Sequence, residues 1–348
     1  MPTSITTRRP HLDRERLLRE LVPPPRFDAE RFSTYRPDPA QPSQAAAVQR
    51  LEEYAAELAS AAGNGSGGGG LGRLFRRGSG GRAAPKGVYL DGGFGVGKTH
   101  LLASLWHAAP EPKAFGTFVE LTNLVGALGF SETVEALQGY RLVCIDEFEL
   151  DDPGDTVLMA TLLTRLAEAG VGLAATSNTL PGALGEGRFA AEDFLREIQK
   201  LADRFEVLTI DGEDYRHRGL APSPPPLSDE EVSARVTDDG LCDNFDDVIR
   251  HLATVHPSRY HALLDGVGSV GWQGVHPVSD QMVALRLVVL ADRLYDNDIP
   301  VYASGHPLGE VFTPELMQGG YRKKYFRAVS RLTALAREGA GEVAHGMG

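Results

Sequence analysis

The sequence predicts an α/β fold of the P-loop NTPase class, in which helices flank a parallel sheet, followed by a mainly helical C-terminal region. Apolar strands alternate with helical segments between residues 84 and 219, and this alternation is typical of a parallel sheet covered on both faces. Residues 92–99 fit a phosphate-binding loop between a strand and a helix. With 348 residues, of which 24% are charged, the chain has the size and composition of about two soluble domains.

Composition excludes several classes of protein. The net charge of −12 argues against a non-specific nucleic-acid coat, because such proteins bind by neutralising phosphates. Cys144 and Cys242 are too few for a disulfide framework, which indicates a reducing compartment. No apolar run approaches the roughly 20 residues that span a bilayer, and the N-terminus lacks an apolar signal core. We therefore expect a cytoplasmic protein without a membrane span.

Two low-complexity stretches divide the chain. The Gly-rich residues 62–83 favour a flexible insertion or linker, and the Pro-rich residues 220–228 favour an extended connector. The remaining segments are expected to be an N-terminal helical segment at 1–61, the P-loop core at 84–219, a mainly helical lid block at 229–338 and a flexible tail at 339–348.

The spacing of apolar residues predicts the elements in order. A helix at 43–62 begins with Ser43 as its N-cap. In the core, the expected strands are 87–90, 116–121, 141–145, 171–176 and 205–210, and the expected helices are 99–108, 157–169 and 190–203. The C-terminal block should contain helices at 245–253, 279–295 and 323–337, with one strand at 299–303.

The phosphate-binding loop reads Gly-Gly-Phe-Gly-Val-Gly-Lys-Thr at positions 92–99. Its glycines allow successive backbone N–H groups to face a phosphate, and the following helix adds its positive dipole end. Lys98 is expected to reach the β- and γ-phosphates, and Thr99 to bind Mg²⁺. All eight residues are therefore candidate nucleotide contacts: Gly92, Gly93, Phe94, Gly95, Val96, Gly97, Lys98 and Thr99.

Polar residues follow two later apolar strands. Asp146 and Glu147 follow the strand 141–145, and we expect Asp146 to bind Mg²⁺ and Glu147 to activate the attacking water. Taken alone, this pair is equally consistent with a solvated acidic turn, and the P-loop decides between the two interpretations. Asn178 ends the next apolar strand, where its amide could bridge the γ-phosphate and the water.

Three arginines lie between that strand and the last strand of the core, namely Arg188, Arg196 and Arg204. A guanidinium offered to the γ-phosphate of a neighbouring subunit accelerates hydrolysis strongly in related systems. Arg204 stands directly before the strand, and we expect it to act in this way. The alternative for each is an ordinary surface arginine.

The ordered motifs resemble those of AAA+ ATPases, and their flanking residues are similar to the AFG-type family, which includes a bacterial cell-division protein. The similar segments are 87–99, 145–148, 175–178, 208–216, 286–295 and 327–332. The resemblance implies an ATPase that uses ATP and Mg²⁺ and forms a homo-oligomer. It also implies a protein partner such as FtsZ or another division component, and a lid in which Arg331 covers the nucleotide.

Two alternatives stay open. A helicase-loader-like AAA+ ATPase would bind single-stranded DNA, for which the basic and aromatic run at 322–327 could provide stacking. The same run could instead be one solvated helix face. A slowly hydrolysing scaffold is the other alternative, and Glu147 and Asn178 argue against it.

Overall fold

The computed structural model describes residues 2–9, 14–63, 85–93, 95–148, 153–178, 199–212 and 223–340. The chain forms two compact units. We call residues 13–23 and 27–218 the P-loop unit, and residues 1–12, 24–26 and 219–348 the C-terminal unit. Most of the predicted insertion at 62–83, most of the tail at 339–348 and the start of the connector at 220–228 lie outside the described residues.

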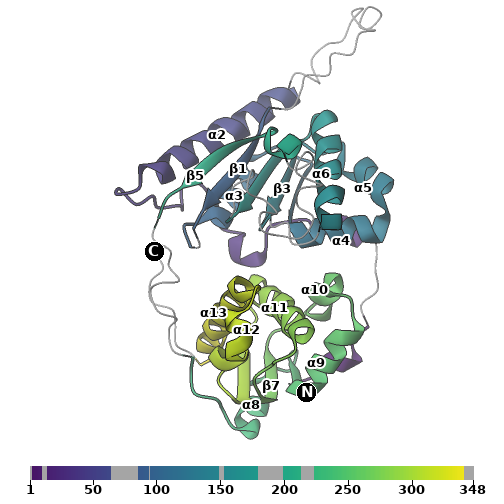
Figure 1. Ribbon diagram of the computed structural model, residues 1–348, viewed down its shortest axis with the longest axis vertical. Coiled ribbons are helices and arrows are strands. Elements are labelled where there is room, and N and C mark those ends of the chain that lie inside the picture. Colours follow the sequence, from purple (N-terminus) through teal and green to yellow (C-terminus); the bar gives the residue numbers. More distant parts are fainter. Residues whose placement is uncertain are drawn as a thin grey trace, which may run out of the picture. The chain divides into compact units, whose positions relative to one another are not determined.

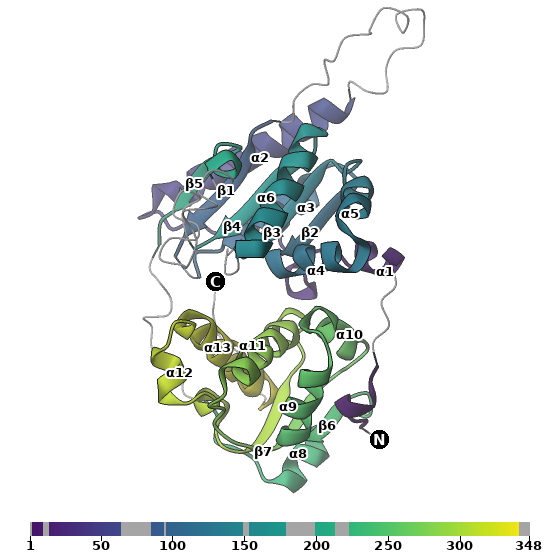
Figure 2. The same cartoon turned by 45° about the vertical axis from the view of Figure 1, so that its right-hand side comes forward.

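A five-stranded parallel sheet forms the centre of the P-loop unit (Figure 2). Its order is β2-β3-β4-β1-β5. The strands are β1 (Gly87–Gly92), β2 (Lys113–Thr117), β3 (Leu142–Asp146), β4 (Gly172–Ser177) and β5 (Phe205–Ile210). Since β4 lies between β1 and β3, the carboxyl ends of these three strands are neighbours at one edge of the sheet.

Helices cover both faces of this sheet (Figure 1). One face packs against α2 (Pro42–Gly63) and α3 (Lys98–Ala108). The other packs against α4 (Phe118–Leu128), α5 (Phe130–Leu137) and α6 (Pro153–Glu168), and α1 (Arg14–Arg19) contributes partly buried leucines there. Successive strand residues alternate between the faces, so Val88 and Leu90 join the first cluster and Tyr89 joins the second. The predicted two-sided parallel sheet is confirmed.

The prediction of a strand at 116–121 is wrong over residues 118–121, because β2 ends at Thr117 and α4 begins at Phe118. Thr117 and Glu120 form a capping box: the Glu120 N–H donates to the Thr117 hydroxyl at 3.2 Å, and the Glu120 carboxylate accepts from the Thr117 N–H at 2.6 Å. This cap overrides the strand-like apolar run. Of the predicted helix at 190–203, residues 199–202 are helical and 190–198 lie outside the described residues.

The C-terminal unit is mainly helical, as predicted, but it also contains a parallel sheet ordered β6-β7-β8. Of these three strands, the sequence predicts only β8, as the strand expected at 299–303. The strands are β6 (Leu241–Asn244), β7 (Val270–Val275) and β8 (Val301–Gly305). The α-helices are α8 (Asp229–Arg235), α9 (Phe245–Thr254), α10 (Tyr260–Leu263), α11 (Gln281–Asp296), α12 (Pro314–Gln318) and α13 (Arg322–Gly339). Short 3₁₀ helices are η1 (Ile5–Thr7), η2 (Pro25–Phe27), η6 (Pro257–Arg259) and η7 (Leu308–Glu310).

The N-terminal segment expected at 1–61 is divided between the units. Its first residues extend the C-terminal sheet, since Thr3 bridges Leu241 in parallel and the Ile5 N–H donates to the Asp243 carboxylate at 3.0 Å. Helix α2 instead buries Leu51 and Tyr54 in the core of the P-loop unit. The same apolar cluster contains Val96 of the phosphate-binding loop, so this helix helps to support that loop.

Candidate nucleotide site

The loop after β1 has the backbone shape of a phosphate-binding loop. Gly95 and Gly97 have φ values of 81° and 85°, in the left-handed region that favours glycine. A Cβ atom on Gly97 would lie 2.6 Å from Cε2 of Tyr35, so a side chain there would force the Tyr35 ring to move. Helix α3 starts at Lys98, and its first N–H groups have no partner within the helix. The loop thus joins glycine flexibility to a helix N-terminus, while Phe94 lies outside the described residues.

Lys98 connects this loop to the end of β4. Its ammonium group donates to the backbone oxygens of Gly92 at 2.8 Å and Gly93 at 2.5 Å, and to Oδ1 of Asn178 at 2.9 Å. Phosphate oxygens are acceptors of the same kind, and they carry the charge that a lysine binds best. The structure therefore brings the predicted phosphate lysine and the predicted polar residue directly after β4 together.

Asp146 and Thr99 form the second half of the site. The Thr99 hydroxyl donates to Oδ1 and Oδ2 of Asp146 at 3.2 and 3.1 Å, although the residues are 47 positions apart. The Asp146 side chain is buried. A hydroxyl and a carboxylate are hard oxygen ligands, which fit Mg²⁺ completed by phosphate oxygens and water. The described residues contain no group of three or more His, Cys, Asp or Glu that could hold a metal by itself.

Glu147 follows β3 directly and has a φ of 52°, one of two positive values at non-glycine residues in the described chain. Its backbone N–H donates to the Thr176 hydroxyl at 3.0 Å. Its side chain is half-buried, at the same edge of the sheet as Asp146 and Lys98. A carboxylate in this place can accept a proton from a water molecule at the site.

The sequence analysis did not predict two residues that lie beside the phosphate-binding loop. Asp91 precedes the loop, and burial raises its pKa although the Lys98 ammonium partly opposes the shift. Tyr35 donates its hydroxyl to the Val96 carbonyl at 2.8 Å, across 61 positions of sequence. No local motif marks Tyr35, so only the fold reveals it.

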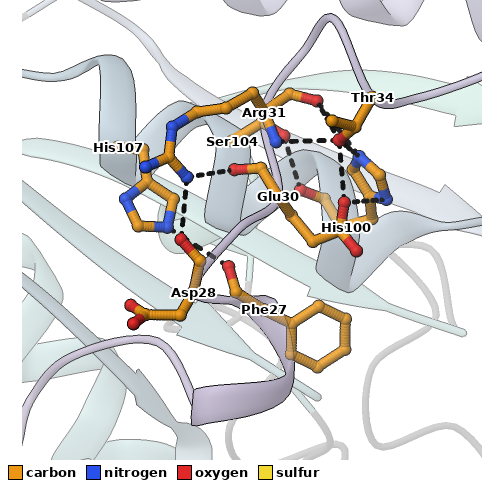
Figure 3. A network of polar contacts seen from close by, with 8 residues as sticks. All are labelled: Phe27, Asp28, Glu30, Arg31, Thr34, His100, Ser104 and His107. Carbon is orange, nitrogen blue, oxygen red and sulfur yellow. Dashed lines mark hydrogen bonds and ion pairs between the residues drawn. The ribbon is translucent and has the colours of Figure 1, made fainter.

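A polar network fastens the segment before Tyr35 to the first turns of α3 (Figure 3). Nδ1 of His100 lies 3.2 Å from the Glu30 carboxylate. Nε2 of His100 lies 3.0 Å from the Thr34 hydroxyl and 3.1 Å from the Arg31 carbonyl. The Tyr35 ring meets the His100 ring edge-on at 5.4 Å. This segment therefore braces the helix whose N-terminus forms the loop.

Arg204 does not join the other site residues. Its carbonyl accepts from the Gly87 N–H at 2.9 Å, which places it at the amino end of β1, opposite the P-loop. Its guanidinium lies 3.4 Å from Glu168, with a third of the side chain exposed. Arg188 and Arg196 lie outside the described residues.

Arg331 belongs to the C-terminal unit, where it shares a carboxylate with Arg327. Oδ1 of Asp292 lies 2.5 Å from Arg331, and Oδ2 lies 2.7 Å from Arg327. Arg331 also lies 5.1 Å from the centre of the Tyr295 ring. Burial opposes ionisation of Asp292, but the two arginines outweigh it and lower its pKa.

The basic run at 322–327 is only partly a surface feature. Tyr325 is 1% exposed, and Arg327 is bound to Asp292. Phe326 is exposed at 40%. The tyrosine is therefore not available as a platform for stacking bases.

A glycine loop with its lysine, a hydroxyl–carboxylate pair and a polar strand end together define a P-loop nucleotide-binding protein of the AAA+ class. Within that class, the chain belongs to the AFG1-like ATPase family, whose sequence profile matches residues 22–236 and 220–340. The resemblance in the sequence analysis is thereby confirmed at the level of the family.

The curated relatives have modest sequence identity to this chain, and each matches only part of it. The cell division protein ZapE of Escherichia coli (strain K12) is 31% identical over 160 residues, which cover 42% of this chain and 43% of that protein. Lactation elevated protein 1 homolog B of Danio rerio is 26% identical over 163 residues, covering 40% and 32%. The chain thus spans less than half the length of these relatives. A crystal structure of the DnaC helicase loader matches 53% of this chain and 99% of that one, at 17% identity and a TM-score of 0.36, too distant to bear on function.

None of the helices in the described part of the chain is both long enough and apolar enough to cross a membrane.

Proposed function

We propose that this chain binds Mg-ATP at the carboxyl edge of β1, β4 and β3 and hydrolyses it to ADP and phosphate. The observation that carries the proposal is the meeting of Lys98, Asn178, Thr99 and Asp146 at that edge. Membership of an ATPase family supports it.

Each part of the site has one task in this proposal. The loop N–H groups and Lys98 bind the β- and γ-phosphates, and Thr99 and Asp146 hold Mg²⁺. When bound, Mg²⁺ neutralises charge on the phosphate oxygens. Asn178 can accept from Lys98 with its oxygen and donate with its amide nitrogen. Asn178 can therefore hold Lys98 and contact the γ-phosphate at the same time.

Glu147 acts as the general base. Its carboxylate takes a proton from a water molecule while the water oxygen forms a bond to the γ-phosphorus. The bond from that phosphorus to the bridging oxygen breaks, and ADP leaves with the electron pair. The adjacent Asp146 is bound by two hydroxyl groups, so it is less suited to accept the proton.

Calorimetric titration with Mg-ATP tests the site. Lys98→Ala should lose most of its nucleotide affinity, because the variant lacks the charge that offsets the β- and γ-phosphates. Lys86→Ala is the matched control, since Lys86 is exposed and precedes the opposite end of β1. Undiminished affinity in Lys98→Ala, or an equal loss in Lys86→Ala, would contradict the assignment.

We further propose that the ATPase is a cytoplasmic homo-oligomer that acts on a protein partner in cell division, with Arg204 and Arg331 completing its sites. The ZapE relative supports this role. FtsZ polymers should raise the ATP turnover of the wild type. No response to FtsZ, together with a rise on single-stranded DNA, would favour the helicase-loader alternative.

A further inference from the structure

Thr176, near the end of β4, makes hydrogen bonds to three successive residues at the end of β3. Its hydroxyl donates to Oδ1 of Asp146 at 2.5 Å and accepts from the Glu147 N–H at 3.0 Å. Its carbonyl oxygen accepts from the Phe148 N–H at 2.7 Å. Thr176 itself is 2% exposed.

The direction of these bonds follows from chemistry. A backbone N–H can only donate, so the Thr176 oxygen must accept from Glu147. The single hydroxyl hydrogen is then available for Asp146, whose carboxylate can only accept while ionised. The two functions of the hydroxyl are thus used by two adjacent residues of the site.

The backbone at Glu147 needs this support. A left-handed φ of 52° is unfavourable for any residue other than glycine. Such conformations persist where surrounding contacts determine them, and they gather at functional sites. The Glu147 and Phe148 amides, which both donate to Thr176, belong to the peptide groups before and after the left-handed residue, so the peptides on both sides of Glu147 are held in place.

We propose that Thr176 is a positioning residue that sets the Asp146 carboxylate and the Glu147 backbone in the geometry required for hydrolysis. This proposal rests on the ATPase function proposed above. Thr176 has no assigned contact with nucleotide or metal, so it acts through its two neighbours. Thr99 differs, because its hydroxyl is assigned to Mg²⁺ as well as bonded to Asp146.

Substitutions that separate the hydroxyl from the side-chain shape test the proposal. Thr176→Val keeps the shape and removes the hydroxyl, whereas Thr176→Ser keeps the hydroxyl. We expect Thr176→Val to lower kcat by about 10- to 100-fold, since a hydrogen bond to a charged group is lost. The KM for ATP should change little, and Thr176→Ser should retain most of the wild-type kcat. Thr161→Val is the control, because Thr161 is exposed on α6 and its hydroxyl donates to the Val157 carbonyl of the same helix at 2.7 Å.

Hydrogen exchange of the nucleotide-free protein gives a readout apart from activity. The Glu147 amide should exchange faster in Thr176→Val than in the wild type, because its acceptor is the hydroxyl that the variant lacks, while the amides of β1 stay protected. If Thr176→Val does not fold, Thr176→Ala leaves space for water and serves in its place. Unchanged kcat and exchange in these variants, or an equal loss in Thr176→Ser, would overturn the proposal. If the wild type releases no phosphate, the ATPase function fails, and the exchange rates still decide whether Thr176 holds the turn.

Discussion

Gly97 is the residue on which the shape of the phosphate loop depends most directly. Its φ is 85°, and a Cβ atom there would lie 2.6 Å from the Tyr35 ring. Gly93, four residues earlier, is exposed, and a Cβ atom there would meet nothing within 4 Å. Two glycines of the same loop thus have different structural needs.

Gly97→Ala should destabilise the nucleotide-free protein by about 1–2 kcal/mol from the left-handed backbone, with a further cost from the contact with Tyr35. Thermal and urea unfolding of the full chain would measure it. Gly93→Ala is the control and should unfold like the wild type. Equal stability of both variants would contradict the loop geometry.

At the level of residues, a local motif was enough to predict which side chains the fold brings together, and their roles stay predictions. Lys98, Asp146 and Asn178 each follow an apolar strand or a glycine run, and parallel strands bring those ends together. Tyr35 and the role of Thr176 could not be predicted in this way. Their partners are remote in sequence, and the choice of partner depends on strand order, which hydrophobic spacing leaves open.

At the scale of elements, α11 and α13 are joined by the pair of arginines on Asp292. These side chains are 14–20% exposed, and removing one partner of a largely buried ion pair leaves an uncompensated charge that costs up to about 3–5 kcal/mol. Asp298 offers a contrast within the same unit, since it pairs with Arg26 at 2.6 Å but its side chain is 45% exposed. Exposed ion pairs contribute about 0–1 kcal/mol to the free energy of unfolding.

Asp292→Asn should therefore destabilise the protein at neutral pH much more than Asp298→Asn. The folded-state pKa of Asp292 is lowered, so its contribution is present above the unfolded value of about 3.9 and is lost as pH falls through the folded value. The stability difference between wild type and Asp292→Asn should then narrow below about pH 4. Unfolding measured from pH 7 to pH 3 would show it, and a difference independent of pH would count against the paired state.

Element prediction was accurate where spacing and length agree. The bounds of β5 match the prediction, and α2 and α3 differ from it by one residue at most. Strands β6 and β7 were missed, because Leu241–Asn244 is short and polar and Val270–Val275 contains two glycines. Their strand state comes from packing within the C-terminal unit, as the burial of Trp272 shows.

At the scale of the whole molecule, the position of Arg204 bears on assembly. It lies at the amino end of the sheet, whereas the P-loop follows the carboxyl end of β1. Its contact with Glu168 is long and lies at the surface, so losing it should affect folding little. A role in hydrolysis would therefore have to be exerted on a neighbouring subunit.

Arg204→Ala should bind Mg-ATP normally and hydrolyse it poorly. Mixing it with Lys98→Ala should restore part of the activity, because some intact P-loops then meet a neighbour's arginine. Size-exclusion chromatography with light scattering would show whether the two variants co-assemble. Co-assembly without recovery of activity would rule out a trans role.

In the proposed reaction, ATP is hydrolysed at the carboxyl edge of β1, β4 and β3 with Glu147 as the base. Phosphate release at saturating Mg-ATP, compared between the wild type and Glu147→Gln, tests it most directly. The amide keeps the shape and loses the base, so release should fall by about 10²- to 10⁴-fold while calorimetry shows retained nucleotide binding. Equal release by the two proteins, or no release by the wild type, would contradict the account.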